Sequence, residues 1–239
     1  MIQEFFTGFA FLTGYFVVCA SCALLLRRFV NMPIEVFRKT LHLILLFSLF
    51  VWVYAFRTWW VSALAAVVFA AIVFPILALG ERIKGYSKLL AERKKGEIKH
   101  SLILVFGMFA AMIGICWGWL GDKMLVLACI FAWGFGDGAA ALVGKRYGQH
   151  FLEGKLIEGR KSIEGTLAMF AVSFLSVIVV LLLRGGLPWH GYIPISALAA
   201  AVCAVVELYT LRGFDTVTCP FAAATVIIPL TWLWGGMML

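Results

Sequence analysis

Residues 124–143 read MLVLACIFAWGFGDGAAALV. The stretch is apolar except for Asp137, which stands between two glycines. A helix of about 20 residues crosses the roughly 30 Å apolar core of a bilayer, so we predict a transmembrane helix here. An acid inside such a helix costs roughly 2.5 to 3.5 kcal/mol on insertion scales and usually faces a cavity with a function. Asp137 is therefore a candidate functional residue; the alternative is a structural ion pair with Lys145 or Arg146.

The whole chain has the same apolar character. It is 64% hydrophobic and only 13% charged, whereas soluble domains have roughly 25% charged residues. We predict an all-α, polytopic integral membrane protein, with one catalytic domain over residues 1–239 and no soluble domain. A tight hairpin at Arg57 separates the second and third spans. The predicted spans are Phe5–Leu26, Leu41–Phe56, Thr58–Leu79, Ser101–Leu120, Met124–Val143, Thr166–Leu183, His190–Leu211 and Val217–Trp234.

The distribution of charge predicts the orientation in the membrane. When alternate loops are assigned to the cytoplasm, those loops collect all of the 20 lysines and arginines except Arg57, Lys123 and Arg184. By the positive-inside rule, both termini then lie outside, and the cell membrane is the expected location. Most tryptophans fall at the outer ends of the spans, as in an interfacial aromatic belt: Trp59, Trp60, Trp117, Trp119, Trp189, Trp232 and Trp234.

Two predicted cytoplasmic loops are long, and the first covers Gly80 to His100. A basic amphipathic helix on an anionic membrane surface fits its pattern, and a solvated charged loop is the alternative. The pattern places apolar Ile83, Tyr86, Leu89 and Leu90 at helical spacing, with Lys84, Lys88, Arg93 and Lys94 around them.

The second long loop, Gly144 to Thr166, combines cations with glycines before the next helix. Glycines, helix N-terminal amides and lysines together suit a polyphosphate, although positive-inside bias also explains the charges. The segment is not a P-loop, because the spacing from Gly138 to Gly144 is one residue too long and Arg146 stands where a Ser or Thr is required. The residues concerned are Lys145, Arg146, Lys155, Arg160 and Lys161, with Gly144, Gly148, Gly154, Gly159 and Gly165.

Two further acids, Glu207 and Asp215, fall near the same predicted cytoplasmic face as Asp137. Mg²⁺ prefers one or two carboxylates together with phosphate oxygens, so these acids suggest a magnesium–nucleotide site. On the same face, Arg38 and His42 are one helical turn apart and can point the same way.

Four motifs follow one another over most of residues 33–230. They are Arg38-Lys39-x-x-His42; Gly136-Asp137-Gly138-Ala139-Ala140 with Gly144-Lys145-Arg146-Tyr147-Gly148; Lys161-Ser162-Ile163-Glu164-Gly165-Thr166; and Glu207 followed by Asp215-Thr216-Val217-Thr218-Cys219-Pro220. Together they resemble the membrane-embedded CTP-dependent lipid kinases, which include dolichol (polyprenol), phytol and yeast-type diacylglycerol kinases. One departure is Thr216, where that family usually has Asn.

The resemblance implies transfer of a phosphate from CTP to a lipid alcohol at the cytoplasmic face, with Mg²⁺ as cofactor. Its expected partners are the nucleotide, the lipid alcohol and the bilayer, with no nucleic acid. On this reading Asp137, Lys161 and Glu164 are catalytic, and Asp137, Asp215 and Glu207 bind the metal. The nucleotide-binding residues are Gly136, Gly138, Lys145, Arg146, Lys161, Arg38, Lys39 and His42.

Three alternatives remain at this point. The related phosphatidate cytidylyltransferases share the general pattern, but their long signature with a Lys-Asp pair has no counterpart here. Gly134-Phe135-Gly136-Asp137 also matches intramembrane aspartyl proteases, which need a second aspartate on a preceding helix; the preceding aspartate in this chain is Asp122, on the predicted outer side. A transporter would explain intramembrane acids but not two basic loops on one face.

Overall fold

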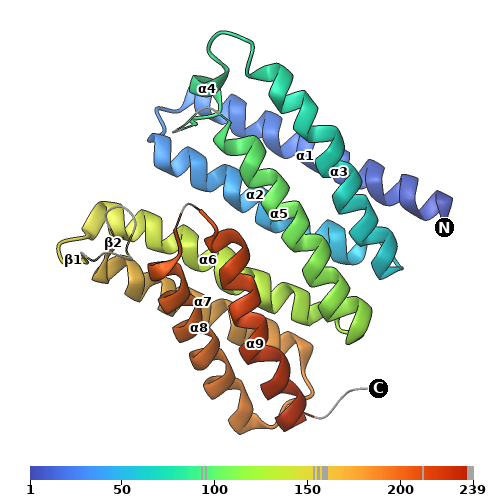
Figure 1. Ribbon diagram of the computed structural model, residues 1–239, viewed down its shortest axis with the longest axis vertical. Coiled ribbons are helices and arrows are strands. Elements are labelled where there is room, and N and C mark those ends of the chain that lie inside the picture. The colour runs from blue at the N-terminus through green and yellow to red at the C-terminus, as the bar shows by residue number, and fades with distance from the viewer. Residues whose placement is uncertain are drawn as a thin grey trace. The chain divides into compact units, whose positions relative to one another are not determined.

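A computed structural model describes residues 1–92, 94, 96–152, 154, 157, 161–211 and 213–235, without the side chains of residues 87 and 88. Within this part of the chain, eight helices are long and apolar enough to cross a membrane, which confirms the predicted fold class (Figure 1). They are α1 (Ile2–Phe29), α2 (Ile34–Tyr54), α3 (Trp59–Gly80), α5 (Glu97–Met112) continued by the π-helix η1 (Ile113–Trp119), α6 (Lys123–Tyr147), α7 (Ile163–Arg184), the 3₁₀ turn η2 (Trp189–Gly191) continued by α8 (Tyr192–Tyr209), and α9 (Asp215–Gly235).

The chain divides into two compact units, Met1–Gly121 and Asp122–Leu239. Each unit has its own packed helices and is described by itself below. The assignment of residues 1–239 to one catalytic domain remains a prediction.

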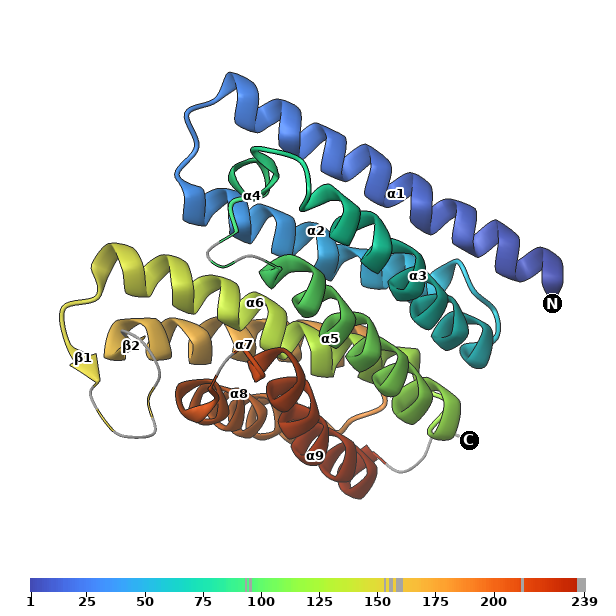
Figure 2. The ribbon, with the colours of Figure 1, turned by 45° about the horizontal axis from the view of Figure 1, so that its top comes forward.

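The first unit is built around aromatic side chains. Helix α3 packs along α5, and α1 packs against α2 (Figure 2). Phe69 of α3 is central to this core, because its ring stacks on Phe16 at 5.1 Å and meets the edge of Phe106 at 5.2 Å. Trp52 of α2 contacts both Phe69 and Phe106. Aromatic rings bury large apolar areas and favour such edge-to-face geometry, so they hold four helices together.

The predicted hairpin between the second and third spans is confirmed. Helix α2 ends at Tyr54 and α3 begins at Trp59. The backbone N–H groups of Arg57 and Thr58 each donate to Glu4 Oε1 at 2.8 Å. Glu4 thus satisfies backbone donors that the break between two helices leaves open.

The predicted amphipathic helix between Gly80 and His100 is wrong in its extent. Helix α4 there covers only Tyr86–Leu89, a single turn. Gly85 before α4, Ala91 after it and Gly96 before α5 adopt φ angles of 92°, 57° and 80°. A right-handed helix cannot continue through residues in this left-handed conformation, so they interrupt the predicted helix. Arg93 and the Lys88 side chain, which belonged to the predicted pattern, lie outside the described residues.

The second unit is a bundle in which α6, α7, α8 and α9 lie side by side (Figures 1 and 2). The most extensive packing joins α6 to α7, because small residues let the two backbones approach closely. A Cβ on Gly136 would overlap Ser173 Oγ, and one on Gly165 would lie 3.0 Å from the Ala140 carbonyl oxygen. The Ser173 hydroxyl itself donates to the Ala132 carbonyl at 2.6 Å.

A short antiparallel pair of strands connects α6 to α7. Strand β1 (Phe151–Leu152) pairs with β2 (Lys161–Ser162), and Leu152 lies opposite Lys161. Helix α6 continues to Tyr147, beyond the predicted end at Val143. The first residues of the predicted loop are therefore helical. Lys145 and Arg146 lie in the last turn, where positive charge interacts favourably with the negative end of the helix dipole. The predicted loop residues Lys155, Gly159 and Arg160 lie outside the described residues.

Candidate active site

Lys161 reaches from β2 to the C-terminal end of α8. Its ammonium donates to the Glu207 carbonyl oxygen at 3.2 Å and makes a shorter contact with Glu207 Oε1. The Glu207 side chain is 7% exposed and that of Lys161 is 26% exposed. Because a buried carboxylate is costly unless it is paired, this contact neutralises Glu207 and fixes the position of Lys161.

A second acid, Asp215, interacts with this ion pair and with a third acid, Asp137. Asp215 is the first residue of α9, and these interactions are electrostatic. The indole Nε1 of Trp133 lies 3.5 Å from Asp215 Oδ2. Asp215 therefore interacts with Asp137 and with both members of the Lys161–Glu207 ion pair. We call these four residues the acidic cluster.

Trp133 was not a candidate from the sequence, although one signal was available. It lies one helical turn before Asp137 on α6, and residues at this spacing share a helix face. His150, described below, had no comparable signal, because its contact spans the connection between two helices.

The donor chemistry of the acidic cluster fits a magnesium ion only in part. Among the described residues, no group of three His, Cys, Asp or Glu side chains could by itself hold a metal ion. The Glu207 carboxylate contacts Lys161, and metal binding by Asp137, Asp215 and Glu207 remains a prediction. Two carboxylates are the usual protein contribution to a magnesium site whose other ligands are water and nucleotide phosphates.

Glu164 makes a different contact from the one expected of a catalytic residue. In the first turn of α7, its Oε1 lies 2.7 Å from His150 Nδ1 and accepts the backbone N–H of His150 at 3.2 Å. Ser162 caps the same helix by accepting the N–H of Gly165 at 3.1 Å. Ser162 and Glu164 therefore both accept backbone N–H groups at the start of α7. The catalytic role of Glu164 remains a prediction.

Lys145 and Arg146 lie in the last turn of α6, and both are exposed. By the 1.5 Å rise per residue, Lys145 is about 12 Å along the helix from Asp137. The guanidinium of Arg146 lies 5.4 Å from the centroid of the Tyr147 ring. The two cations thus lie on the same helix as Asp137, about two turns closer to its C-terminal end.

The glycines of the predicted nucleotide site have different surroundings. Gly136 packs against α7, as do Gly144 and Gly148, where an added Cβ would lie 3.2 Å and 2.9 Å from Ser162 Oγ. Gly138 has nothing within 4 Å of such a Cβ. Close helix packing therefore accounts for three of these glycines, and Gly138 is the one with open space beside it.

Comparison with known proteins supplies the family. No protein-family model matches the chain, and no solved structure matches it. A phytol kinase of Synechocystis sp. (strain ATCC 27184 / PCC 6803 / Kazusa) is 30% identical over 219 residues, which is 89% of this chain and 86% of that protein. The chain belongs to this lipid kinase family. Because each compact unit holds about half of the chain, the similarity includes residues of both units.

Membership in the lipid kinases favours phosphate transfer over the other activities considered from the sequence. An intramembrane aspartyl protease and a transporter have no support in this comparison. The acidic cluster of the lipid kinase also differs from a protease dyad, because one of its carboxylates, that of Glu207, pairs with Lys161.

Three predicted nucleotide-binding residues of the lipid kinase, Arg38, Lys39 and His42, lie on α2 in the first unit and are half-buried. Arg38 forms ion pairs with Glu97 at 2.8 Å and with Glu35 at 3.3 Å. These contacts tie α2 to the start of α5. The part of the three residues in nucleotide binding remains a prediction.

Proposed function

We propose that this lipid kinase transfers the γ-phosphate of CTP to the hydroxyl group of a membrane lipid alcohol, with Mg²⁺, at the cytoplasmic face. The observation that carries the proposal is the acidic cluster, in which Lys161 pairs with Glu207 and Asp215 interacts electrostatically with Asp137, Lys161 and Glu207. The similarity to a phytol kinase makes a long-chain isoprenoid alcohol the first substrate to test. Polyprenols, dolichol and diacylglycerol are the next substrates to test, because the motifs resemble those of kinases that act on these lipids.

The proposed reaction forms one bond and breaks one. The lipid hydroxyl oxygen attacks the γ-phosphorus of CTP, and the bond between that phosphorus and the oxygen bridging to the β-phosphate breaks. CDP leaves, and the hydroxyl proton passes to the Asp137 carboxylate and from there to water. Such a transfer needs positioning and charge neutralisation more than covalent chemistry from the protein.

Each residue of the acidic cluster has a role in this scheme. Asp137 orients the hydroxyl and accepts its proton, and Asp137 and Asp215 would hold Mg²⁺. The metal, when bound, would neutralise charge on the phosphate oxygens. Lys161 offers an ammonium to the transferred phosphate, where charge develops. Glu207 acts through Lys161: the carboxylate and carbonyl contacts hold the ammonium in place.

Lys145 and Arg146 would bind the remaining phosphates of the nucleotide. Both are exposed at the end of the helix that carries Asp137. Contacts between such cations and phosphate oxygens are charge-assisted and are among the stronger hydrogen bonds in proteins.

An isotope experiment tests the proposal directly. The purified protein is incubated with Mg²⁺ and a panel of phytol, farnesol, a polyprenol, diacylglycerol and phosphatidate, using CTP labelled at either the γ- or the α-phosphate. A kinase transfers only the γ label into the lipid fraction. Label from the α-phosphate in the product formed from phosphatidate would instead identify a cytidylyltransferase. Parallel reactions with labelled ATP, GTP and UTP test the choice of nucleotide.

A further inference from the structure

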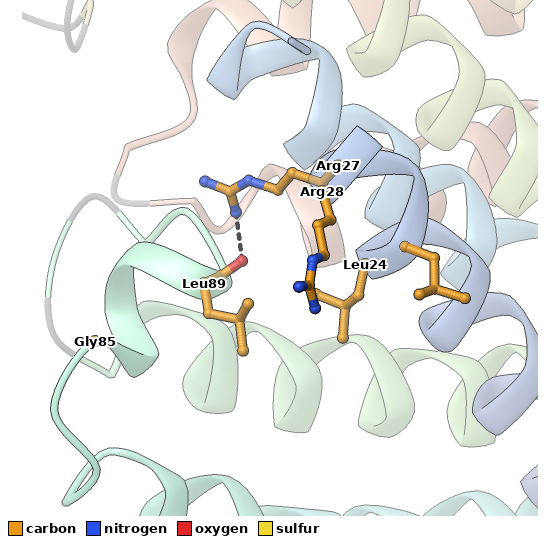
Figure 3. Close-up of a pocket in the computed structure, with 6 residues that line it drawn as sticks. Leu24, Arg27, Arg28, Gly85 and Leu89 are labelled. Atoms are coloured by element: carbon orange, nitrogen blue, oxygen red, sulfur yellow. Dashed lines mark hydrogen bonds between the residues drawn. The ribbon is translucent and has the colours of Figure 1, made fainter. Parts of the chain in front are cut away.

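A groove of about 540 Å³ lies between the end of α1 and the turn α4 in the first unit (Figure 3). None of the proposed catalytic or nucleotide-binding residues lines it. Its walls come from the last turns of α1 and from the segment around α4, and the lining residues are Leu24, Leu25, Arg27, Arg28, Gly85 and Leu89.

Arg27 is held in place at this groove. One of its guanidinium nitrogens donates to the Leu89 carbonyl oxygen, as the dashed line in Figure 3 shows. Its guanidinium carbon lies 4.4 Å from the centroid of the Phe37 ring. The guanidinium is thus positioned by a carbonyl group and an aromatic face, neither of which neutralises its charge.

Two other half-buried cations in this unit are neutralised by acids. Arg38 pairs with Glu97 at 2.8 Å, and Lys99 pairs with Glu81 at 2.8 Å. Arg27 and Arg28 have no carboxylate partner within the described residues. Two arginines that line one groove and lack an acid among the described residues provide a site for an anion from outside the protein.

Apolar side chains next to these charges restrict the kind of anion. Leu24 is half-buried, and Leu25 and Leu89 are exposed beside the guanidinium groups. Gly85 adds no side chain, and a Cβ there would meet nothing within 4 Å. A free phosphate would use the arginines and leave the leucines uncovered, whereas a lipid with a phosphate head group covers both.

We propose that this groove binds an anionic phospholipid of the surrounding membrane, with its phosphate between Arg27 and Arg28 and an acyl chain along Leu24, Leu25 and Leu89. The position fits such a ligand, because the groove lies at the end of a spanning helix, where polar head groups meet the apolar core. Basic residues at this level attract anionic lipids. The bound lipid would join α1 to α4, which the Arg27–Leu89 contact already connects.

The test compares lipids on purified full-length protein in a neutral detergent. Bound lipid is counted by native mass spectrometry, and the unfolding temperature is followed in parallel. Long-chain phosphatidylglycerol should bind at one site and raise the unfolding temperature more than phosphatidylcholine of the same chains. Arg28→Gln should weaken this binding by about fivefold, which corresponds to one basic residue at an anionic surface. Arg28 is exposed, so its replacement leaves the packing of the unit intact.

Lys84→Gln is the matched control, because Lys84 is an exposed cation near Gly85 that does not line the groove. Its binding should equal that of the unchanged protein. Equal binding of the two lipids, equal loss in both variants, or no loss with Arg28→Gln would overturn the proposal. Glycerol phosphate that displaces the long-chain lipid at equal concentration would also overturn it, because the leucines would then contribute nothing.

Discussion

The ammonium of Lys161 lies against both the side-chain carboxylate and the main-chain carbonyl of Glu207, and so joins β2 to the end of α8. Both residues were candidates from the sequence, with Glu207 expected as a metal ligand and Lys161 as a phosphate contact. Their direct pairing is the reason that we propose a positioning role for Glu207. It also means that a loss of activity in a Lys161 variant can arise from lost chemistry or from an unpaired buried acid.

A set of three variants separates these two causes. Lys161→Met leaves the Glu207 carboxylate buried and unpaired, so it should lower both the unfolding temperature and kcat. The double variant Lys161→Met, Glu207→Met should recover much of the stability, because no buried charge remains, but should stay inactive. The unfolding temperature in detergent and the rate of phosphate transfer are both measured. Recovery of activity in the double variant would remove Lys161 from the catalytic residues.

Asp137→Asn preserves the size of the side chain and removes its charge. If Asp137 accepts the hydroxyl proton or binds Mg²⁺, kcat should fall by roughly a hundredfold or more while the protein still inserts into the membrane and purifies normally.

Asp122→Asn is the matched control at the other end of α6. Asp122 accepts the N–H of Met124 at 2.9 Å as the N-cap and contacts Arg184. Asparagine also caps helices well, so this variant should be somewhat less stable but should turn over substrate at a nearly normal rate. Equal turnover in the two variants would contradict the assignment of Asp137.

Gly136 and Gly138 flank Asp137 but should respond differently to alanine. A Cβ on Gly136 would overlap Ser173 Oγ and lie 3.1 Å from Met169 Cγ. Gly136→Ala should therefore lower the free energy of unfolding by about 1 to 3 kcal/mol, as overpacking does. The added change Ser173→Ala should restore part of this loss.

In Gly138→Ala the added methyl group meets nothing within 4 Å, so stability should be unchanged. If Gly138 lies beside the nucleotide, its variant should raise the KM for CTP. An equal fall in the unfolding temperatures of both single variants would show that the two glycines are equivalent.

Lys145→Gln and Arg146→Gln test the proposed contacts with the nucleotide phosphates. Each should raise the KM for CTP or lower kcat, because charge-assisted contacts to phosphate are lost. The measurement is made at about 0.15 M salt, where the Debye length of about 8 Å suppresses long-range attraction. Lys94→Gln, a control in the connection between α4 and α5, should have neither effect. Identical results for all three variants would mean that Lys145 and Arg146 do not contact the nucleotide and contribute only to the orientation of the protein in the membrane.

The predicted orientation has its own test in a background without the native cysteines. A cysteine at Gln149, in the connection between α6 and β1, should react with a membrane-impermeant thiol reagent only after the cytoplasmic side is opened. A cysteine at His190, in the exposed turn η2, should react in sealed right-side-out vesicles. The reverse pattern would place the acidic cluster away from the cytoplasmic nucleotide pool and would contradict the proposed function.

The sequence by itself was sufficient for the number of helices that can span a membrane and for the hairpin at Arg57. Hydrophobicity is summed along a segment of about 20 residues, so a spanning helix can be recognised without its neighbours. Asp137, Lys161, Glu207 and Asp215 could be named as candidates from the sequence, because charged residues in or beside apolar helices are rare and costly. Their roles stay predictions. The end of α6 and the extent of α4 were predicted less accurately, because the residue at which a helix ends depends on local backbone conformations such as the left-handed one of Ala91.

Only the tertiary structure decided which of these residues meet. Glu164 was expected to be catalytic and Glu207 to bind the metal, but their protein partners could not be predicted: Glu164 contacts His150 and Glu207 contacts Lys161. Gly136 and Gly138 looked alike, yet only Gly136 lies against α7. Side-chain partners of this kind come from different helices, and the distance between them depends on how closely the helices pack. That packing follows from the shapes of both helix surfaces, which no single segment of the sequence contains.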